Sequence, residues 1–183
     1  SDRTVKVWDL ERGVLLHSLE GHTEGVDNLL LTADGRLISS CSSFGNSRDH
    51  TVKVWDLERG VLLHSLEGHT AGVSNLLLSG DGRLISSCSH GDYSVKVWDL
   101  ERGALLHSLE GHFESIKFVL NSPTQVGQFL TIGGSQAILW DIDSGKRVAQ
   151  FTADGDIRSC VWAHDGTIVL GDGIGRVHFL RLQ

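Results

Sequence analysis

Short runs of alternating apolar and polar residues, separated by turn residues, recur along the whole chain. In residues 73–110 a first run, VSNLLLS, is followed by Asp81-Gly82 and then by RLISSCS, SVKVWDL and ALLHSLE. An Asp-Gly pair tolerates the positive φ angles of a two-residue hairpin loop, and SVKVWDL alternates valine with lysine and tryptophan. No segment has a sustained helical period. The pattern therefore predicts an all-β chain whose units contain four strands.

This strand pattern belongs to an internal repeat. Residues 4–23 read TVKVWDLERGVLLHSLEGHT, residues 51–70 are identical, and residues 95–112 differ only at Ala104. Two diverged units follow, ending in AILWD and RVHFLRL. The anchor positions of successive units are 47, 43, 42 and 39 residues apart, at Trp8, Trp55, Trp98, Trp140 and Phe179. This spacing brackets the roughly 40–45 residues of a four-stranded propeller blade.

The repeat divides the chain into five expected units. They are residues 1–22 (partial), 23–68, 69–111, 112–154 and 155–183, the last without its fourth strand. About 17 strands result, in about four blades. Four blades are few for a closed propeller, so we expect either part of a larger ring or a ring built from two copies. The sequence leaves both possibilities open.

The composition of the chain limits the kinds of partner and the cellular location that we expect. The net charge of −7 counts against a nucleic-acid or anionic-membrane partner, because either would need a basic stripe. No apolar run approaches the 18 residues of a membrane span. An odd count of three cysteines argues against a disulfide framework and for a reducing, cytoplasmic location.

Two dipeptides recur with the repeat. Gly-His pairs stand at 21–22, 68–69 and 111–112, and Trp-Asp pairs stand at 8–9, 55–56, 98–99 and 140–141. Over essentially the whole chain this combination resembles the WD-repeat β-propeller family. The resemblance implies blades of four antiparallel strands around a central channel, and a scaffold without chemistry or cofactor. The final stretch, GDGIGRVHFLRLQ, resembles the closing blade of propellers fused to large signalling NTPases, although no P-loop motif is present.

The family resemblance also implies a hydrogen-bonded tetrad in each blade. In such a tetrad a Trp N–H donates to a Ser or Thr, the hydroxyl to a His, and the His to an Asp, so that each buried polar atom has a partner. Residue by residue, this gives His22, Ser39, Asp49 and Trp55 in one unit and His69, Ser86, Asp92 and Trp98 in the next. A third unit keeps His112, Thr131 and Trp140 but has Gly134 in place of the Asp.

The same side chains offer a hydrolase as a rival interpretation. Ser39 would then be the nucleophile and His22 its base. A nucleophile needs exposure and an oxyanion hole, whereas a structural set copied into two units needs neither. We therefore favour the structural interpretation and predict that the chain is not an enzyme.

The ten histidines raise the question of a metal site. His17, His64 and His107 occupy one repeat position in three separate units, so they should not converge on one ion. Cys41 and Cys88 are also repeat-equivalent, and we expect them to fill small spaces in the core. We predict no metal ligands.

The near-identical units differ most clearly in the connections between fourth and first strands. TEGVD at 23–27 becomes TAGVS at 70–74 and FESIK at 113–117. The resemblance places partner binding on the face that carries these connections. We therefore expect a protein partner to contact Glu24, Asp27, Ser74, Phe113, Lys117 and Arg158. Phe44, in an inserted loop, is a further candidate, with a tolerated insertion as the alternative. A structural or oligomerisation arm of a larger signalling receptor, including contact with a second copy, is the alternative function.

Overall fold

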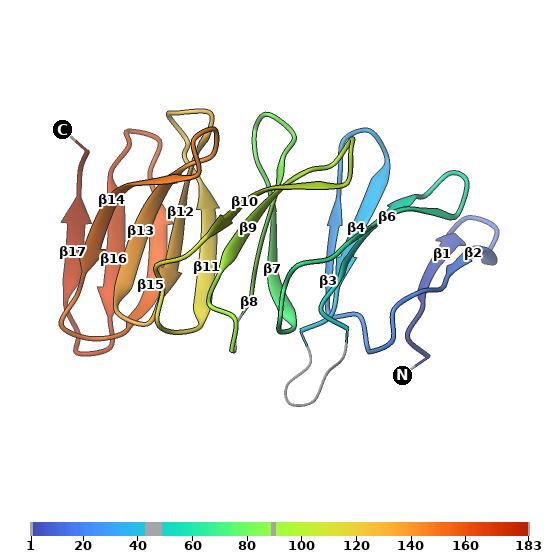
Figure 1. Ribbon diagram of the computed structural model, residues 1–183, viewed down its shortest axis with the longest axis horizontal. Helices are drawn as coiled ribbons and strands as arrows, with labels where there is room; N and C mark the ends of the chain where they lie inside the picture. Colours follow the sequence, from blue (N-terminus) through green and yellow to red (C-terminus); the bar gives the residue numbers. More distant parts are fainter. Residues whose placement is uncertain (1, 43–48, 89–90, 183) are drawn as a thin grey trace.

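The computed structural model describes residues 2–42, 49–88 and 91–182, which form five antiparallel sheets side by side in an open row (Figure 1). The first sheet has two strands, β1 (Val5–Asp9) and β2 (Val14–Leu19). The last sheet has three strands, β15 (Ile157–Trp162), β16 (Ile168–Asp172) and β17 (Val177–Leu180). Within these described ranges the sheets do not close into a ring.

Three complete four-stranded sheets lie between these two. The first contains β3 (Asn28–Leu31), β4 (Arg36–Ser40), β5 (Val52–Asp56) and β6 (Val61–Leu66). The second contains β7 (Val73–Leu78), β8 (Leu84–Cys88), β9 (Val95–Asp99) and β10 (Ala104–Leu109). The third contains β11 (Ile116–Asn121), β12 (Gln128–Gly133), β13 (Gln136–Asp141) and β14 (Lys146–Thr152). The predicted all-β class and the four-stranded antiparallel blades are confirmed.

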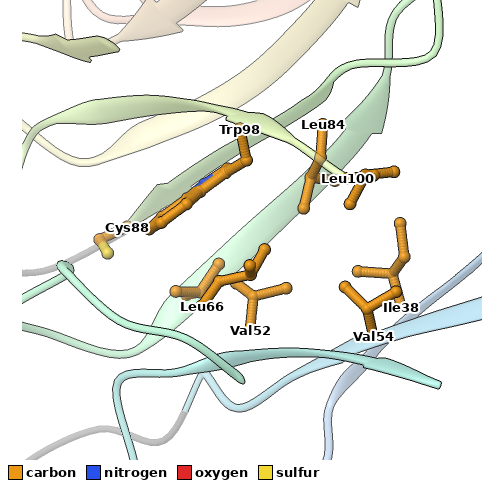
Figure 2. Close-up of a cluster of buried hydrophobic side chains, with 9 residues drawn as sticks. Ile38, Val52, Val54, Leu66, Leu84, Cys88, Trp98 and Leu100 are labelled. Carbon is orange, nitrogen blue, oxygen red and sulfur yellow. The ribbon is translucent and has the colours of Figure 1, made fainter. Parts of the chain in front are cut away.

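The hydrophobic core lies between neighbouring sheets. Figure 2 shows one such layer, in which side chains of β4, β5 and β6 face side chains from β8, β9 and the residue after β9. The side chains drawn and labelled there are Ile38, Val52, Val54, Leu66, Leu84, Cys88, Trp98 and Leu100. A sheet therefore buries its apolar face only where another sheet covers it. No helix in the described ranges is long and apolar enough to cross a membrane.

Position in the row decides how far the repeated tryptophan is buried. Trp55 is only 2% exposed, whereas Trp8 is 51% exposed. Leu37 of the adjacent strand β4 lies opposite Trp55 in the sheet. Trp8 belongs to a sheet that consists of β1 and β2 alone, so it has no such second strand beside it.

The last sheet corrects the expected position of the fifth repeat anchor, Phe179. Trp140 lies opposite Phe129 in the register of β12 and β13, and the residue in the same place on β17 is Leu180, opposite Ile168. Phe179 is 72% exposed instead. A shift of one residue in a strand moves a side chain to the other face, so choosing the aromatic residue as the anchor was wrong by one position.

The histidines of the fourth strands join neighbouring sheets. Each ring packs against a turn glycine of the following sheet, and a Cβ on that glycine would overlap the ring. The pairs are His17 with Gly60, His64 with Gly103 and His107 with Gly145, and the three glycines have φ between 63° and 66°. The three histidines thus lie at three separate interfaces between neighbouring sheets.

Candidate functional site

The first complete sheet holds four polar side chains in a hydrogen-bonded chain. Trp55 Nε1 donates to Ser39 Oγ at 2.8 Å, and His22 Nε2 lies 2.8 Å from the same oxygen. His22 Nδ1 lies 2.7 Å from Asp49 Oδ2, which also accepts the backbone N–H of Thr23 at 2.8 Å. The indole can only donate and an ionised Asp can only accept, so the protons point along the chain from Trp55 to Asp49.

The second complete sheet repeats this arrangement. Trp98 Nε1 donates to Ser86 Oγ at 2.8 Å, His69 Nε2 lies 2.8 Å from that oxygen, and His69 Nδ1 lies 3.3 Å from Asp92 Oδ2. Burial opposes the ionisation of Asp92, but hydrogen bonds, led by the one from His69, outweigh it and hold the pKa of Asp92 far below its usual range. The pKa of Asp49 is lowered in the same way.

The third complete sheet has only the inner part of the chain. Trp140 Nε1 donates to Thr131 Oγ1 at 2.7 Å, and His112 Nε2 lies 2.7 Å from the same oxygen. His112 Nδ1 is buried and has no partner among the described residues. Burial without a carboxylate partner lowers the pKa of His112 to about 4. The Glu114 carboxylate lies beside Gly134, but it makes no described bond to the ring.

The serines proposed as nucleophiles in the rival interpretation lie in the core. Ser39 and Ser86 are both 0% exposed, and each hydroxyl contacts an indole and an imidazole. A nucleophile must meet its substrate, so this geometry favours a structural role for both sets.

The structure also brings a cysteine to each tetrad, which the sequence analysis missed. Cys41 Sγ lies 3.3 Å from His22 Nδ1 and 3.7 Å from Asp49 Oδ2, and Cys88 lies 3.1 Å from His69 Nδ1. A signal was present, because each cysteine follows the tetrad serine by two residues. Such a group could hold a metal ion only after losing the Nδ1 proton and the thiol proton. Burial raises the pKa of Cys41 to about 12, which favours the protonated thiol.

The residues expected to bind a partner lie in or next to the connections between sheets, which follow the lower edge of Figure 1. Phe113 is 77% exposed and Arg158 is also exposed. Glu24 and Ser74 are half-buried. Phe44 lies outside the described residues.

Two charged residues on this edge already have partners. Asp27 Oδ2 accepts the backbone N–H of Ser42 at 2.8 Å and its hydroxyl at 3.0 Å. Lys117 Nζ lies 3.6 Å from Asp156 Oδ2 of the next connection. These two side chains can still contact a partner, but they would have to share or exchange their present bonds.

A pocket of about 320 Å³ opens beside Phe113. It is lined by Thr70, by residues 91–94 and by residues 110–113. Tyr93, a lining residue that the sequence analysis missed, is the only tyrosine in the chain and stands one residue after the tetrad Asp, where the preceding unit has His50.

Comparisons with known proteins agree with the repeat. The family model for the WD domain, G-beta repeat, matches residues 13–56 and 60–99. A crystal structure of the computationally designed Ika8 protein is similar, with 28% identity and a TM-score of 0.78 over 99% of this chain and 53% of that chain. A chain of the mitotic checkpoint complex is similar in fold, with 23% identity and a TM-score of 0.78 over 100% of this chain and 57% of that chain. The present chain therefore spans about half the length of these structures. No curated protein matches it.

Proposed function

Because two stretches of this chain, residues 13–56 and 60–99, match the WD40 repeat and its complete sheets have four antiparallel strands each, we propose that it is a non-catalytic WD40 scaffold that binds a protein partner. The partner would bind at the edge formed by the connections between sheets. One observation carries this proposal: repeats that are otherwise nearly identical differ in these connections. A variable edge on a constant core is the arrangement expected of a recognition surface.

Phe113 is the expected centre of the contact. It is a large aromatic side chain, 77% exposed, in a position where two other repeats have threonine, Thr23 and Thr70. Exposed aromatic side chains supply most of the binding energy in many protein interfaces, because they bury a large area at a small entropic cost. Arg158, Glu24 and the paired charges nearby would set the orientation of the partner.

A structural arm that contacts a second copy is the alternative proposal. It is favoured by the two outer sheets, which expose side chains of the kind that the inner sheets bury. They include Trp8 at one end of the row and Val177 and Phe179 at the other. A cytoplasmic location is part of both proposals, since Cys41, Cys88 and Cys160 are all free thiols.

Site-specific photo-crosslinking in cells tests the scaffold proposal. A benzophenone amino acid at position 113 should cross-link to a discrete protein, whereas the same group at Glu101, which is exposed in a turn on the opposite edge, should not. Phe113→Thr restores the residue of the other repeats, so it should reduce co-purification of that protein by about tenfold with an unchanged melting temperature. Equal cross-linking from both positions would contradict the proposed binding edge.

A further inference from the structure

Two aromatic residues that differ from the preceding repeat line the same pocket. Phe113 replaces the threonine of the preceding repeat, Thr70, and Tyr93 replaces its histidine, His50. The two positions are 20 residues apart in the sequence, yet both line the pocket of about 320 Å³ between the loop after β8 and the segment after β10. Both rings are exposed, Phe113 at 77% and Tyr93 at 37%. The pocket is therefore the place where this unit has acquired aromatic surface.

The charged side chains that line this pocket are negative. Asp92 is ionised, but its carboxylate already accepts bonds from His69, Thr70 and Ser94. Glu110 is exposed and has no described ion pair. His112 has a pKa of about 4, so near neutral pH it adds no positive charge. A ligand in this pocket would thus meet an available carboxylate at the end of β10.

We propose that this pocket binds a basic side chain, an arginine or a lysine, from a protein partner. This proposal rests on the proposed function, because the pocket lies on the same edge. Aromatic faces attract cations through the ring quadrupole, and a carboxylate beside them completes the charge pairing. An anionic group would be repelled by Glu110 and Asp92, and an apolar group would leave the Glu110 carboxylate desolvated and unpaired.

The preceding repeat provides a matched comparison. At the equivalent positions it keeps the acidic residue, Glu67, but has Thr70 and His50 in place of the two aromatic residues. Aromatic surface and an acidic residue are thus combined in one repeat, and only the acidic residue is present in the other. Selective binding in the pocket next to Phe113 would therefore show that the rings, and not the acidic residue alone, recognise the cation.

Small-molecule probes test this inference without the natural partner. N-acetyl-arginine methylamide should shift the backbone amide NMR signals of residues 91–94 and 110–113 with a millimolar dissociation constant. The citrulline analogue, which has nearly the same shape but no charge, should bind at least about tenfold more weakly. The double variant Tyr93→His, Phe113→Thr should lose these shifts, and Glu110→Gln should weaken binding, whereas Glu67→Gln should leave it unchanged.

Three results would overturn the inference: equal binding of the citrulline probe, retention of binding by the double variant, or an equal loss in Glu67→Gln. The melting temperature of every variant should match that of the parent chain, because the substituted side chains lie at the surface or copy the other repeat. The probe experiment and the cross-linking experiment can fail separately. Cross-linking from position 113 without cation binding would remove only the basic-side-chain proposal. Cation binding without a cross-linked protein would remove the scaffold proposal and, with it, the protein partner, and would leave only the preference of the pocket for a cation.

Discussion

The sheets β7–β10 and β11–β14 share the inner part of the hydrogen-bonded chain and differ at its end. In both, an indole and an imidazole contact one hydroxyl at 2.7–2.8 Å. The imidazole of His69 continues to Asp92, whereas that of His112 ends without a partner. The Asp is therefore not needed to assemble the tryptophan, hydroxyl and histidine. The register of the second and third strands already brings the hydroxyl and the indole together, and the histidine reaches the same hydroxyl from the connection before the first strand.

The loop between the second and third strands explains why only one of these sheets has the Asp. Between β8 and β9 the chain makes a longer loop, and Asp92 accepts the backbone N–H groups of Thr70 and Ser94 there. Between β12 and β13 only Gly134 and Ser135 intervene, and their carbonyl groups accept bonds from the chain that follows β14. In the tight turn, backbone carbonyl groups accept the hydrogen bonds that connect the turn to the neighbouring chain. In the longer loop, a side-chain carboxylate accepts such bonds instead.

The largest expected effect that would test this comparison is a pH dependence caused by His112. Its pKa is about 4 in the folded chain and about 6.5 when unfolded, so between these values only the unfolded chain binds the proton. The contribution of His112 to the free energy of unfolding should therefore fall by about 3 kcal/mol as the pH drops from about 6.5 to about 4, and should stay constant above that range. Urea unfolding of the parent chain and of His112→Gln at several pH values measures this contribution. Identical pH profiles would contradict this prediction, because they would show that folding does not lower the pKa of His112.

Removal of the carboxylate from the complete tetrad should have the next largest effect. Asp92→Ala removes the carboxylate acceptor of the buried His69 Nδ1–H and releases two backbone donors, which should cost about 2 kcal/mol at neutral pH. The urea midpoint should fall while the m-value stays constant. Asp143→Ala is the control and should change stability by less than about 1 kcal/mol, because the Asp143 side chain is 74% exposed and its partner Arg83 keeps a second ion pair with Asp81.

A smaller effect compares the two histidines directly. His69→Leu leaves the Asp92 carboxylate without its ring partner, whereas His112→Leu removes a ring that has no such partner. Both changes remove the hydrogen bond between the imidazole and the hydroxyl. The difference in stability between the two variants therefore measures the bond between His69 and Asp92. His69→Leu should be the more destabilising by about 1 kcal/mol. Thermal melts at pH 7.5 suffice for the measurement. Equal losses would mean that the bond between His69 and Asp92 adds no net stability.

The sequence by itself determined the elements and their repetition. Alternating residues, Asp-Gly turns and exact repeats predicted strands in four-stranded units, because strand formation and tight turns depend on local backbone preferences. The resemblance implied Asp49 and Asp92 as tetrad residues, and the repeat supported this assignment, since each stands six residues before its tryptophan in spite of different loop lengths. Structural information contained in short, repeated segments could thus be read directly.

Only the tertiary structure decided which side chains from separate segments meet. It placed Leu180 instead of Phe179 at the tetrad position, because register depends on the pairing of β16 with β17 and not on which residue is aromatic. It exposed Trp8 while burying Trp55, although the surrounding sequence is the same, because burial depends on the strands alongside. It also brought Tyr93 to the pocket beside Phe113. Contacts of this kind form between distant parts of the chain, and no local pattern of residues encodes them.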